Sequence, residues 1–208
     1  SGTSWQATYT MTSSDSEGTV SFSIDFSDLS GNAASTISST TNSSTVQFDK
    51  TAPSLSQVTA VTTPTSDTTP SYIFSSNEAG TISYGGSCSS STTSASTDNN
   101  TITFNTLSGG TYSDCTVTVT DSANNASSAL SVSTFIVDRT APSLSEVTAV
   151  PTPSSDNSST YTFSSDEAGT ITYGGSCSSS TTSASASNNT ITFNELADGT
   201  YDNCTIAV

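Results

Sequence analysis

Carboxylate and amide side chains recur at turn-like positions of the chain, where their oxygens could bind a metal ion. Asp49 and Asp138 each begin an Asp-x-Thr-Ala-Pro run, and Glu78 lies in an Asn-Glu-Ala-Gly run. Oxygen ligands suit Ca²⁺, which accepts six to eight of them. The alternative interpretation, which we favour, is turn formation, because Asp bonds its own backbone and Gly31 or Asn124 tolerates a left-handed conformation. The candidate ligands are Asp49, Glu78, Asp121, Asn125, Asp138 and Glu167.

Four cysteines are the second chemical feature of the chain. Cys88 precedes Cys115 by the same spacing that separates Cys177 from Cys204. Zinc sites use clustered Cys with His, and the chain has no His, so we predict a disulfide within each pair. Each bridge should stabilise the fold by roughly 3 to 4 kcal/mol on the chain-entropy estimate. Persistent disulfides imply an oxidising environment.

Catalysis is not expected from these residues. Nucleophilic hydrolysis needs a base beside Ser or Cys, and the chain lacks His while its cysteines are expected to be paired. The acids stand singly at turns, and the Tyr-Gly-Gly runs at Tyr84 and Tyr173 lack the pattern of a phosphate-binding loop. Those two tyrosines could stack on a sugar ring, so glycan binding is one alternative function, although half-buried strand positions are the favoured interpretation. We expect no required cofactor, and Ca²⁺ at domain junctions is the one ion that the residues suggest.

The charge balance restricts the partners of the chain. Asp and Glu number 18 against 2 Lys and Arg, for a formal net charge of −16. Nucleic-acid affinity depends on Lys and Arg that displace counterions, so DNA and RNA are not expected partners. No stretch approaches the roughly 20 apolar residues of a membrane span, and direct membrane insertion is not expected. The charge is best explained by solubility.

The chain contains an internal repeat with a β-strand pattern. Residues 49–119 and 138–208 align without a gap over about 50 identities, which indicates one fold built twice. Runs such as Val-Thr-Val-Thr from Val117 place apolar residues on one face of a strand and Ser or Thr on the other. Short strands separated by Gly, Asn, Asp and Pro are typical of an all-β sandwich. The predicted strands of the middle repeat are 54–61, 71–75, 81–84, 101–107, 111–120 and 129–137.

Several phrases resemble bacterial Ig-like domains strung in tandem through large repetitive surface proteins and adhesins. They are FDKTAPSLSQV, EAGTISYGGSC, GTYSDCTVTVTD and FIVDRTAP, and the likeness covers nearly the whole chain. The resemblance implies elongated, tandem, antiparallel Greek-key β-sandwiches with an Asp-x-Thr-Ala-Pro junction between domains. It also implies a secreted bacterial protein, extracellular or at the cell surface, that serves as a rod or stalk of an adhesin. Its partners would be neighbouring Ig-like domains of the same or another chain and a surface glycan or protein ligand.

Two details depart from antibody-type domains. Cys88 comes after the strand 81–84, so its bridge should join the end of that strand to its sheet neighbour at 111–120. Tyr112 stands three residues before Cys115 instead of two, which argues against a tyrosine corner.

In a sandwich of this topology, Glu78, Asp121 and Asp49 share the end that faces the previous domain. Ca²⁺ bound there would stiffen the joint.

We expect three domain segments. Residues 1–48 are predicted to be the C-terminal part of one Ig-like domain, 49–138 a complete domain, and 139–208 a domain lacking its last strand. The first segment should expose half a core, formed by Trp5, Tyr9, Val20, Phe22, Ile24 and Phe26. Either the sequence is a window onto a longer chain, which we favour, or chains complete one another by strand exchange in a head-to-tail extracellular filament.

Overall fold

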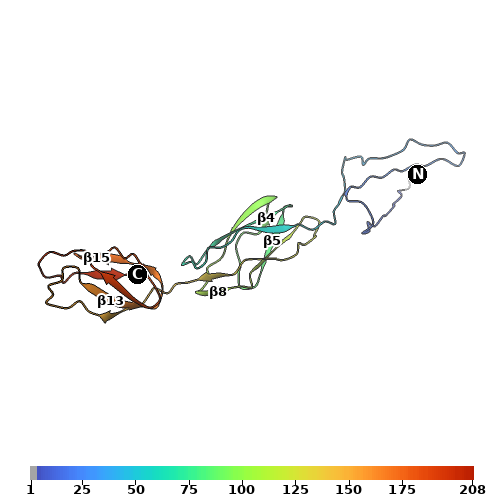
Figure 1. Cartoon of the computed structure of the whole chain (residues 1–208). Helices are drawn as coiled ribbons and strands as arrows, with labels where there is room; N and C mark the ends of the chain where they lie inside the picture. The colour runs from blue at the N-terminus through green and yellow to red at the C-terminus, as the bar shows by residue number, and fades with distance from the viewer. Residues whose placement is uncertain (1–3) are drawn as a thin grey trace. The chain divides into compact units, whose positions relative to one another are not determined.

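The computed structural model describes residues 4–208 and is all-β, with no helix among these residues. The chain divides into two compact units between Arg139 and Thr140. The predicted boundary after residue 138 lies beside this division, whereas the predicted boundary after residue 48 falls inside the first unit. Figure 1 labels β4, β5 and β8 in the first unit and β13 and β15 in the second.

The middle part of the first unit, residues 49–139, contains two antiparallel sheets and one separate strand pair. One sheet has the order β3-β4-β7, and its strands are Leu55–Thr59, Ser71–Ser76 and Asp98–Thr103. The other has the order β10-β9-β5-β6, with strands Leu130–Ser131, Thr116–Thr120, Gly80–Gly85 and Ser94–Ala95. The pair is β8 with β11, Gly110–Tyr112 and Phe135–Val137. This arrangement is consistent with a β-sandwich.

The alternation of Ser or Thr with apolar residues builds the core of this part. In β9, Val117 and Val119 are fully buried while Thr116, Thr118 and Thr120 are half-buried. In β4, Tyr72 and Phe74 are fully buried, and they pack with residues of both sheets in one hydrophobic cluster. The period of two therefore directs one face of each strand into the core, as the sequence predicts.

Two predicted strands are each divided in the structure. The strand expected at 111–120 breaks into β8 and β9, which pair with different partners, β11 for the first and β5 and β10 for the second. At the break, the carbonyl of Asp114 lies so close to Gly86 that a Cβ there would collide with it, and Gly86 has φ +74°. The strand expected at 129–137 breaks where the backbone N–H of Ser133 donates to Oε1 of Gln57 (3.1 Å). A close backbone approach at the first break and a side-chain hydrogen bond at the second accompany the interruption of strands that alternation predicts as continuous.

The second unit repeats most of this framework. Its strands are β12 Leu144–Thr148, β13 Thr160–Ser165, β14 Gly169–Thr170, β15 Thr172–Gly174, β16 Ser183–Ala184, β17 Asn188–Thr192 and β18 Thr205–Ala207. One sheet has the order β12-β13-β17, and β15 pairs with β18 in the register of β5 with β9. Both units carry a cis peptide bond at the same repeat position, before Pro64 and before Pro153. Residues 199–201, which correspond to β8, form no strand.

The N-terminal segment, residues 4–48, has less regular structure than expected. The strands expected in SWQATYTM, GTVSFSIDFSD and STVQFD reduce to β1 (Gly18–Thr19) paired with β2 (Gln47–Phe48), plus isolated bridges such as Ile24 with Ile37. The segment is the open blue trace in Figure 1. Among the described residues, no second sheet covers its apolar side chains, and a short strand pair without such cover is only marginally stable. Val20 is half-buried, and the other expected residues are exposed: Trp5, Tyr9, Phe22, Ile24 and Phe26.

The two predicted disulfides are present. Cys88 bonds Cys115 and Cys177 bonds Cys204, with Cα atoms 5.2 and 5.3 Å apart. Cys88 follows β5 and Cys115 precedes β9, two strands that pair directly, so the bridge joins neighbours of one sheet as expected. The two disulfides indicate an oxidising environment.

The hydrogen bond of a tyrosine corner is present, although the spacing of Tyr112 to Cys115 argued against one. The hydroxyl of Tyr112 donates to the carbonyl of Ser108 (2.9 Å), and Tyr201 makes the same bond to Ala197 (2.8 Å). Because the bond reaches back four residues along the chain, it depends on the local turn and not on the spacing to the cysteine.

Removing one bridge should destabilise its own unit. We expect Cys88→Ala with Cys115→Ala to lower the free energy of unfolding of the first unit by roughly 3 kcal/mol, because the reduced chain regains loop entropy when unfolded. Chemical denaturation followed by Trp and Tyr fluorescence measures this change. The matched Cys177→Ala, Cys204→Ala variant should leave the transition of the first unit unchanged; equal loss in both units would contradict independent closure.

Candidate metal centre

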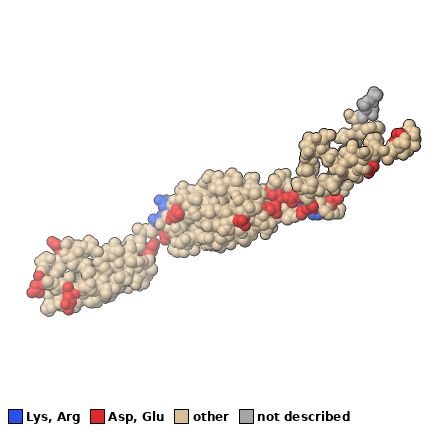
Figure 2. All heavy atoms as spheres, turned by 90° about the horizontal axis from the view of Figure 1, so that it is seen from above, with Lys and Arg blue, Asp and Glu red and all other residues tan. Residues whose placement is uncertain are grey.

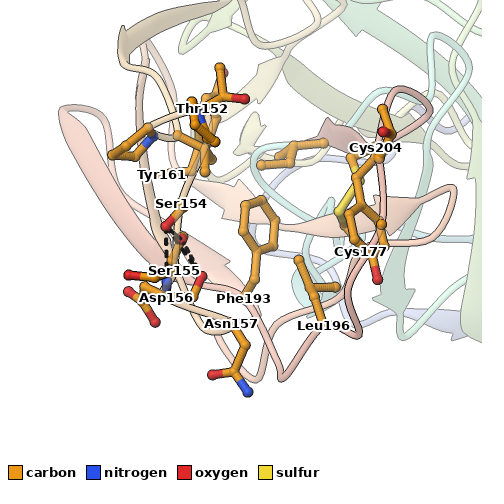
Figure 3. A pocket seen from close by; sticks show the side chains of 18 of the residues that line it. Thr152, Ser154, Ser155, Asp156, Asn157, Tyr161, Cys177, Phe193, Leu196 and Cys204 are labelled. Carbon is orange, nitrogen blue, oxygen red and sulfur yellow. Dashed lines mark hydrogen bonds between the residues drawn. A yellow bond between two sulfur atoms is a disulfide. The ribbon is translucent and has the colours of Figure 1, made fainter.

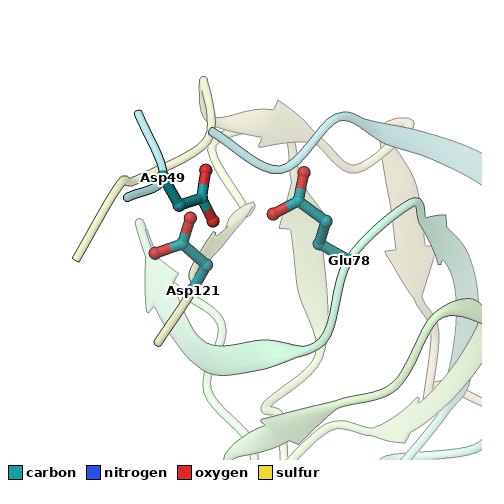
Figure 4. A group of neighbouring side chains, drawn as sticks. All are labelled: Asp49, Glu78 and Asp121. Atoms are coloured by element: carbon teal, nitrogen blue, oxygen red, sulfur yellow. The ribbon is translucent and has the colours of Figure 1, made fainter. Parts of the chain in front are cut away.

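Three of the predicted ligands come together at one end of the middle part. Asp49, Glu78 and Asp121 each place a carboxylate oxygen within 4.8 Å of the other two. Figure 4 shows the three side chains pointing toward one another from three separate segments of the chain. Asp49 follows β2, Glu78 lies between β4 and β5, and Asp121 directly follows β9. The arrangement converges from residues up to 72 positions apart in the sequence.

Asp121 is positioned by the turn that it starts. Its Oδ1 accepts the backbone N–H groups of Ala123 (2.8 Å) and Asn125 (2.9 Å), and Asn124 adopts φ +71°. Asp28 accepts equivalent bonds from Ser30 and Asn32, with Gly31 at φ +86°. The turn interpretation is therefore confirmed for both aspartates. It requires a left-handed residue, which explains the Gly and Asn at these positions.

Asp49 and Glu78 are held by their own loops. Oδ1 of Asp49 accepts the backbone N–H of Thr51 (3.0 Å). The hydroxyl of Ser76 donates to the carbonyl of Glu78 (2.6 Å), so the backbone on either side of that residue is fixed. Asp49 and Glu78 are half-buried, and Asp121 is only 8% exposed. The cluster is thus partly shielded from water.

Negative charge accumulates at this cluster. Desolvation, followed by repulsion from Asp49, Asp121 and Glu17, raises the pKa of Glu78. At Asp121, desolvation acts upward on the pKa, but hydrogen bonds from Asn125 and the turn backbone together lower it. The surroundings of Glu78 therefore disfavour its charged form. A bound cation would remove this penalty.

Residues of the N-terminal segment support the same junction, and sequence patterns did not indicate them. Oε1 of Glu17 accepts the backbone N–H of Lys50 (2.9 Å) and the hydroxyl of Thr51 (2.7 Å). The ammonium of Lys50 donates to the carbonyls of Ser13 and Asp15, each at 2.9 Å. Glu17 lies outside any repeat or motif, so only its proximity in the fold reveals this role.

The remaining predicted ligands have different placements. The side-chain nitrogen of Asn125 donates to Oδ2 of Asp121 (2.9 Å) and to the carbonyl of Asp49 (3.3 Å). Asn125 therefore acts as a donor that ties two cluster residues together, and its role as an oxygen ligand stays a prediction. Asp138 belongs to the first unit and Glu167 to the second, and their role as ligands stays a prediction.

Tyr84 and Tyr173, the candidates for sugar stacking, are half-buried strand residues. Each hydroxyl donates to a backbone carbonyl at 2.6 Å, that of Thr92 for Tyr84 and that of Thr181 for Tyr173. Both rings pack against the hydrophobic cluster of their unit. This placement accounts for the two residues by packing, and glycan binding stays a prediction.

Comparison of the chain with protein-family models, curated proteins and solved structures returned no match. Among residues 4–208, no helix is long and apolar enough to cross a membrane. Figure 2 shows that uncharged residues form most of the visible surface, with acidic atoms in small groups. The repeat, the disulfides and the carboxylate cluster are therefore the features of the molecule that bear on its function.

Removing one charge from the cluster should stabilise the ion-free protein. A raised folded-state pKa means that charged Glu78 opposes folding at pH values above that pKa, and that the cost disappears below about pH 4, where the residue is protonated in both states. We expect Glu78→Gln, in chelator at pH 7, to melt a few degrees higher than the unmodified protein.

The same melting curves at about pH 3 should coincide for the two proteins, since Glu78 is then neutral. The control is Glu195→Gln, which removes one charge from an exposed position of the second unit. If Glu195→Gln raises the melting temperature as much as Glu78→Gln does, the effect reports net charge and not the cluster.

Proposed function

We propose that this chain is a structural repeat region of a large bacterial surface protein or adhesin. In this proposal, tandem Ig-like sandwiches form a rod or stalk that holds other parts of the protein away from the cell. The chain has no catalytic role in this function. Its location would be extracellular or at the cell surface.

The observation that carries this proposal is the repetition of one disulfide-closed framework behind the same junction. Two copies of the framework have matching bridges, matching register at β5 with β9 and β15 with β18, and matching Asp-x-Thr-Ala-Pro starts. Pro53 and Pro142 follow the junction aspartates and limit the backbone where one repeat leads into the next. Repetition of one framework along the chain favours a spacer over a specific binding module.

Hydrogen bonding at the junctions also supports a defined joint. The backbone N–H of Ser54 donates to Oδ1 of Asn77 (2.6 Å), and that of Ser143 donates to Oδ1 of Asp166 (2.7 Å). In both repeats, the residue after the junction proline is thus hydrogen-bonded to the same loop, which lies between β4 and β5 in the first unit and between β13 and β14 in the second. An isolated flexible linker would have no need for this repeated bond.

The Ig-like topology is part of the proposal. Two sheets of the orders β3-β4-β7 and β10-β9-β5-β6 surround one core, as expected for a seven-stranded sandwich of this kind. The tyrosine bond before β9 is a further shared feature. The disulfide within one sheet differs from the inter-sheet bridge of antibody domains.

We further propose that Asp49, Glu78 and Asp121 bind Ca²⁺ and stiffen the joint between the N-terminal segment and the middle part. Three carboxylates supply hard oxygen ligands, and the repulsion on Glu78 gives the cluster a reason to prefer a cation. Because Lys50 and Thr51, the two residues after Asp49, donate hydrogen bonds to Glu17 of the N-terminal segment, an ion at Asp49 would act on both sides of the junction.

Calcium should therefore stabilise the first unit. We expect its melting temperature to rise with millimolar Ca²⁺ over chelator, since an ion that binds only the folded state adds stability by mass action. The second unit, whose transition can be followed in the same calorimetric scan, should respond less. The Glu78→Gln variant should lose most of the rise. An unchanged transition in the unmodified protein would exclude the calcium proposal while leaving the spacer proposal intact.

The rod itself is tested by small-angle X-ray scattering on the intact chain. A compact folded particle of 208 residues would have a radius of gyration of about 17 Å, and an unfolded chain about 49 Å. We expect a value clearly above the compact limit, with a folded Kratky profile. A radius near the compact limit would contradict the rod.

A further inference from the structure

Each repeat carries an Asn-Asn-Thr triplet at the same position of an edge strand. The triplets are residues 99–101 in β7 and 188–190 in β17. Asn-x-Thr and Asn-x-Ser triplets are acceptors for asparagine-linked sugars in secreted proteins, and such sugars are bulky and lie at the surface. Because Ser and Thr are abundant in this chain, triplets also arise by chance. The fold distinguishes those that can carry a sugar from those that cannot.

Strand geometry presents the two essential residues of the triplet together. Successive residues of a strand point to opposite faces, so residues two positions apart share a face. Asn99 and Thr101 are exposed, whereas Asn100 between them is only 9% exposed. β7 is the last strand in the order β3-β4-β7, so no described strand lies along its outer side. The acceptor amide and the hydroxyl therefore stand side by side on an accessible surface.

The fold explains why residue 100 is an asparagine but gives no such reason for Asn99. Oδ1 of Asn100 accepts the backbone N–H of Ser96 (2.7 Å), and its Nδ2 donates to the carbonyls of Ser96 (2.9 Å) and Asp98 (3.0 Å). The second unit repeats these bonds. Among residues 4–208, the side chains of Asn99 and its repeat counterpart Asn188 make no hydrogen bond. Asparagine is unfavourable in strands, so its presence at this position of both repeats requires another reason.

Two other triplets begin with asparagines whose amides the fold already uses. Nδ2 of Asn125 donates to Oδ2 of Asp121 (2.9 Å) and to the carbonyl of Asp49 (3.3 Å), so both of its hydrogens are engaged. Nδ2 of Asn203 donates to the hydroxyl of Ser176 (3.2 Å), and its Oδ1 accepts the backbone N–H of the same residue (3.2 Å). A sugar on either nitrogen would displace bonds that hold a turn.

The triplet at residues 157–159 is closed at its third residue. Ser159 is 5% exposed, and its hydroxyl donates to the carbonyl of Asp156 (2.9 Å). In Figure 3, Asn157 follows Asp156 on a loop that borders a pocket of the second unit, and dashed lines mark hydrogen bonds of this loop. Because a transferase must recognise the hydroxyl of the triplet, this one is a poor acceptor. Asn42 begins a further triplet in the N-terminal segment, outside the repeat.

We propose that Asn99 and Asn188 are attachment sites for asparagine-linked sugars. The sugar donor is of the class in which the anomeric carbon is joined to a phosphate. In the transfer, Nδ2 of the asparagine forms a bond to the anomeric carbon, the bond from that carbon to the phosphate oxygen breaks, and the phosphate leaves with the electron pair. The proton released from Nδ2 passes to a base of the transferase. Attachment does not depend on the spacer function, because the two residues are equally accessible in a chain with any role.

A sugar at these positions would protect an open edge of each sheet. The edge strand of a sheet exposes N–H and C=O groups that can pair with another strand, and proteins often guard such an edge with charged side chains. β7 has one charged residue, Asp98 at its start, and β17 has none. A bulky, hydrophilic sugar on Asn99 or Asn188 would hinder the approach of a foreign strand in their place.

The test is peptide mapping of the protein isolated from the cells that make it naturally. After reduction, cleavage after Asp and Glu separates the triplets into different peptides. Fragmentation by electron transfer keeps a sugar on its side chain and so identifies the modified residue. We expect sugars on Asn99 and Asn188. The asparagines that begin the other triplets of the two repeats should be unmodified: Asn125, Asn157 and Asn203.

Two variants made in the same cells distinguish recognition of the triplet from general surface exposure. Thr101→Ala removes the hydroxyl of the first triplet and should abolish the sugar on Asn99, while the sugar on Asn188 stays as an internal control. Thr101→Ser keeps a hydroxyl and should keep the sugar on Asn99. Both variants should fold and melt like the unmodified protein, because Thr101 is exposed and its side chain makes no hydrogen bond among the described residues.

Unmodified Asn99 and Asn188 in the natural protein would overturn the proposal, as would sugars joined only to Ser or Thr hydroxyls of the same peptides. Equal occupancy of Asn125 or Asn203 would also contradict it, because placement in the fold would then not decide attachment. A sugar on Asn99 that survives Thr101→Ala would show that the triplet is not recognised. None of these outcomes bears on the spacer function, which is tested by scattering.

Discussion

The pairing of β5 with β9, closed at its end by the Cys88–Cys115 bridge, is the constraint on which the middle part depends. The chain is rich in Ser and Thr and has few large apolar residues, so each sheet contributes only one thin apolar face. A small core leaves little surplus over the conformational entropy of the backbone. A covalent closure at the end of the longest pair in the second sheet lowers the entropy of the unfolded chain and so adds to the stability of this small core. The same closure recurs at Cys177–Cys204 in the second unit.

The closure also explains why local geometry near the bridge is so strongly specified. Gly86 and Gly175 share φ +74°, and each lies against the backbone carbonyl of the residue before the second cysteine. The Tyr-Gly-Gly run is therefore a requirement of the bridge and its turn, with no ligand needed to account for it. The hydroxyl of Ser87 donates to Oδ2 of Asp114 (2.8 Å) and completes the turn on the other side. The Tyr-Gly-Gly run, which could have formed a binding site, therefore forms the turn beside the bridge.

Sequence patterns predicted the features that depend on spacing within one repeat. The alternation around Val117 and the matching cysteine pairs were sufficient for the sheets and the bridges. They failed where a side chain competes with a strand hydrogen bond, as Gln57 does at Ser133, because alternation contains no information about distant donors. They also failed for the N-terminal segment, where a β pattern exists but no second sheet covers it. Convergence of Asp49, Glu78 and Asp121 was predicted from topology, whereas Glu17 required the fold itself.

The turn and the metal hypotheses for Asp121 are compatible, and comparison with Asp28 separates their contributions. Asp28 makes the same turn bonds while exposed, and no group of three acids forms around it among residues 4–208. Turn formation therefore explains the conformation of the loop after β9 but not the approach of Asp49 and Glu78. Desolvation, and after it the repulsion from the neighbouring acids, raises the pKa of Glu78. A carboxylate has about four acceptor positions, and the three hydrogen bonds to Asp121 from Ala123 and Asn125 leave capacity for a cation. The fold holds Glu78 close to Asp49 and Asp121, although the turn at Asp121 already has its hydrogen bonds. A bound cation would explain why these carboxylates lie together.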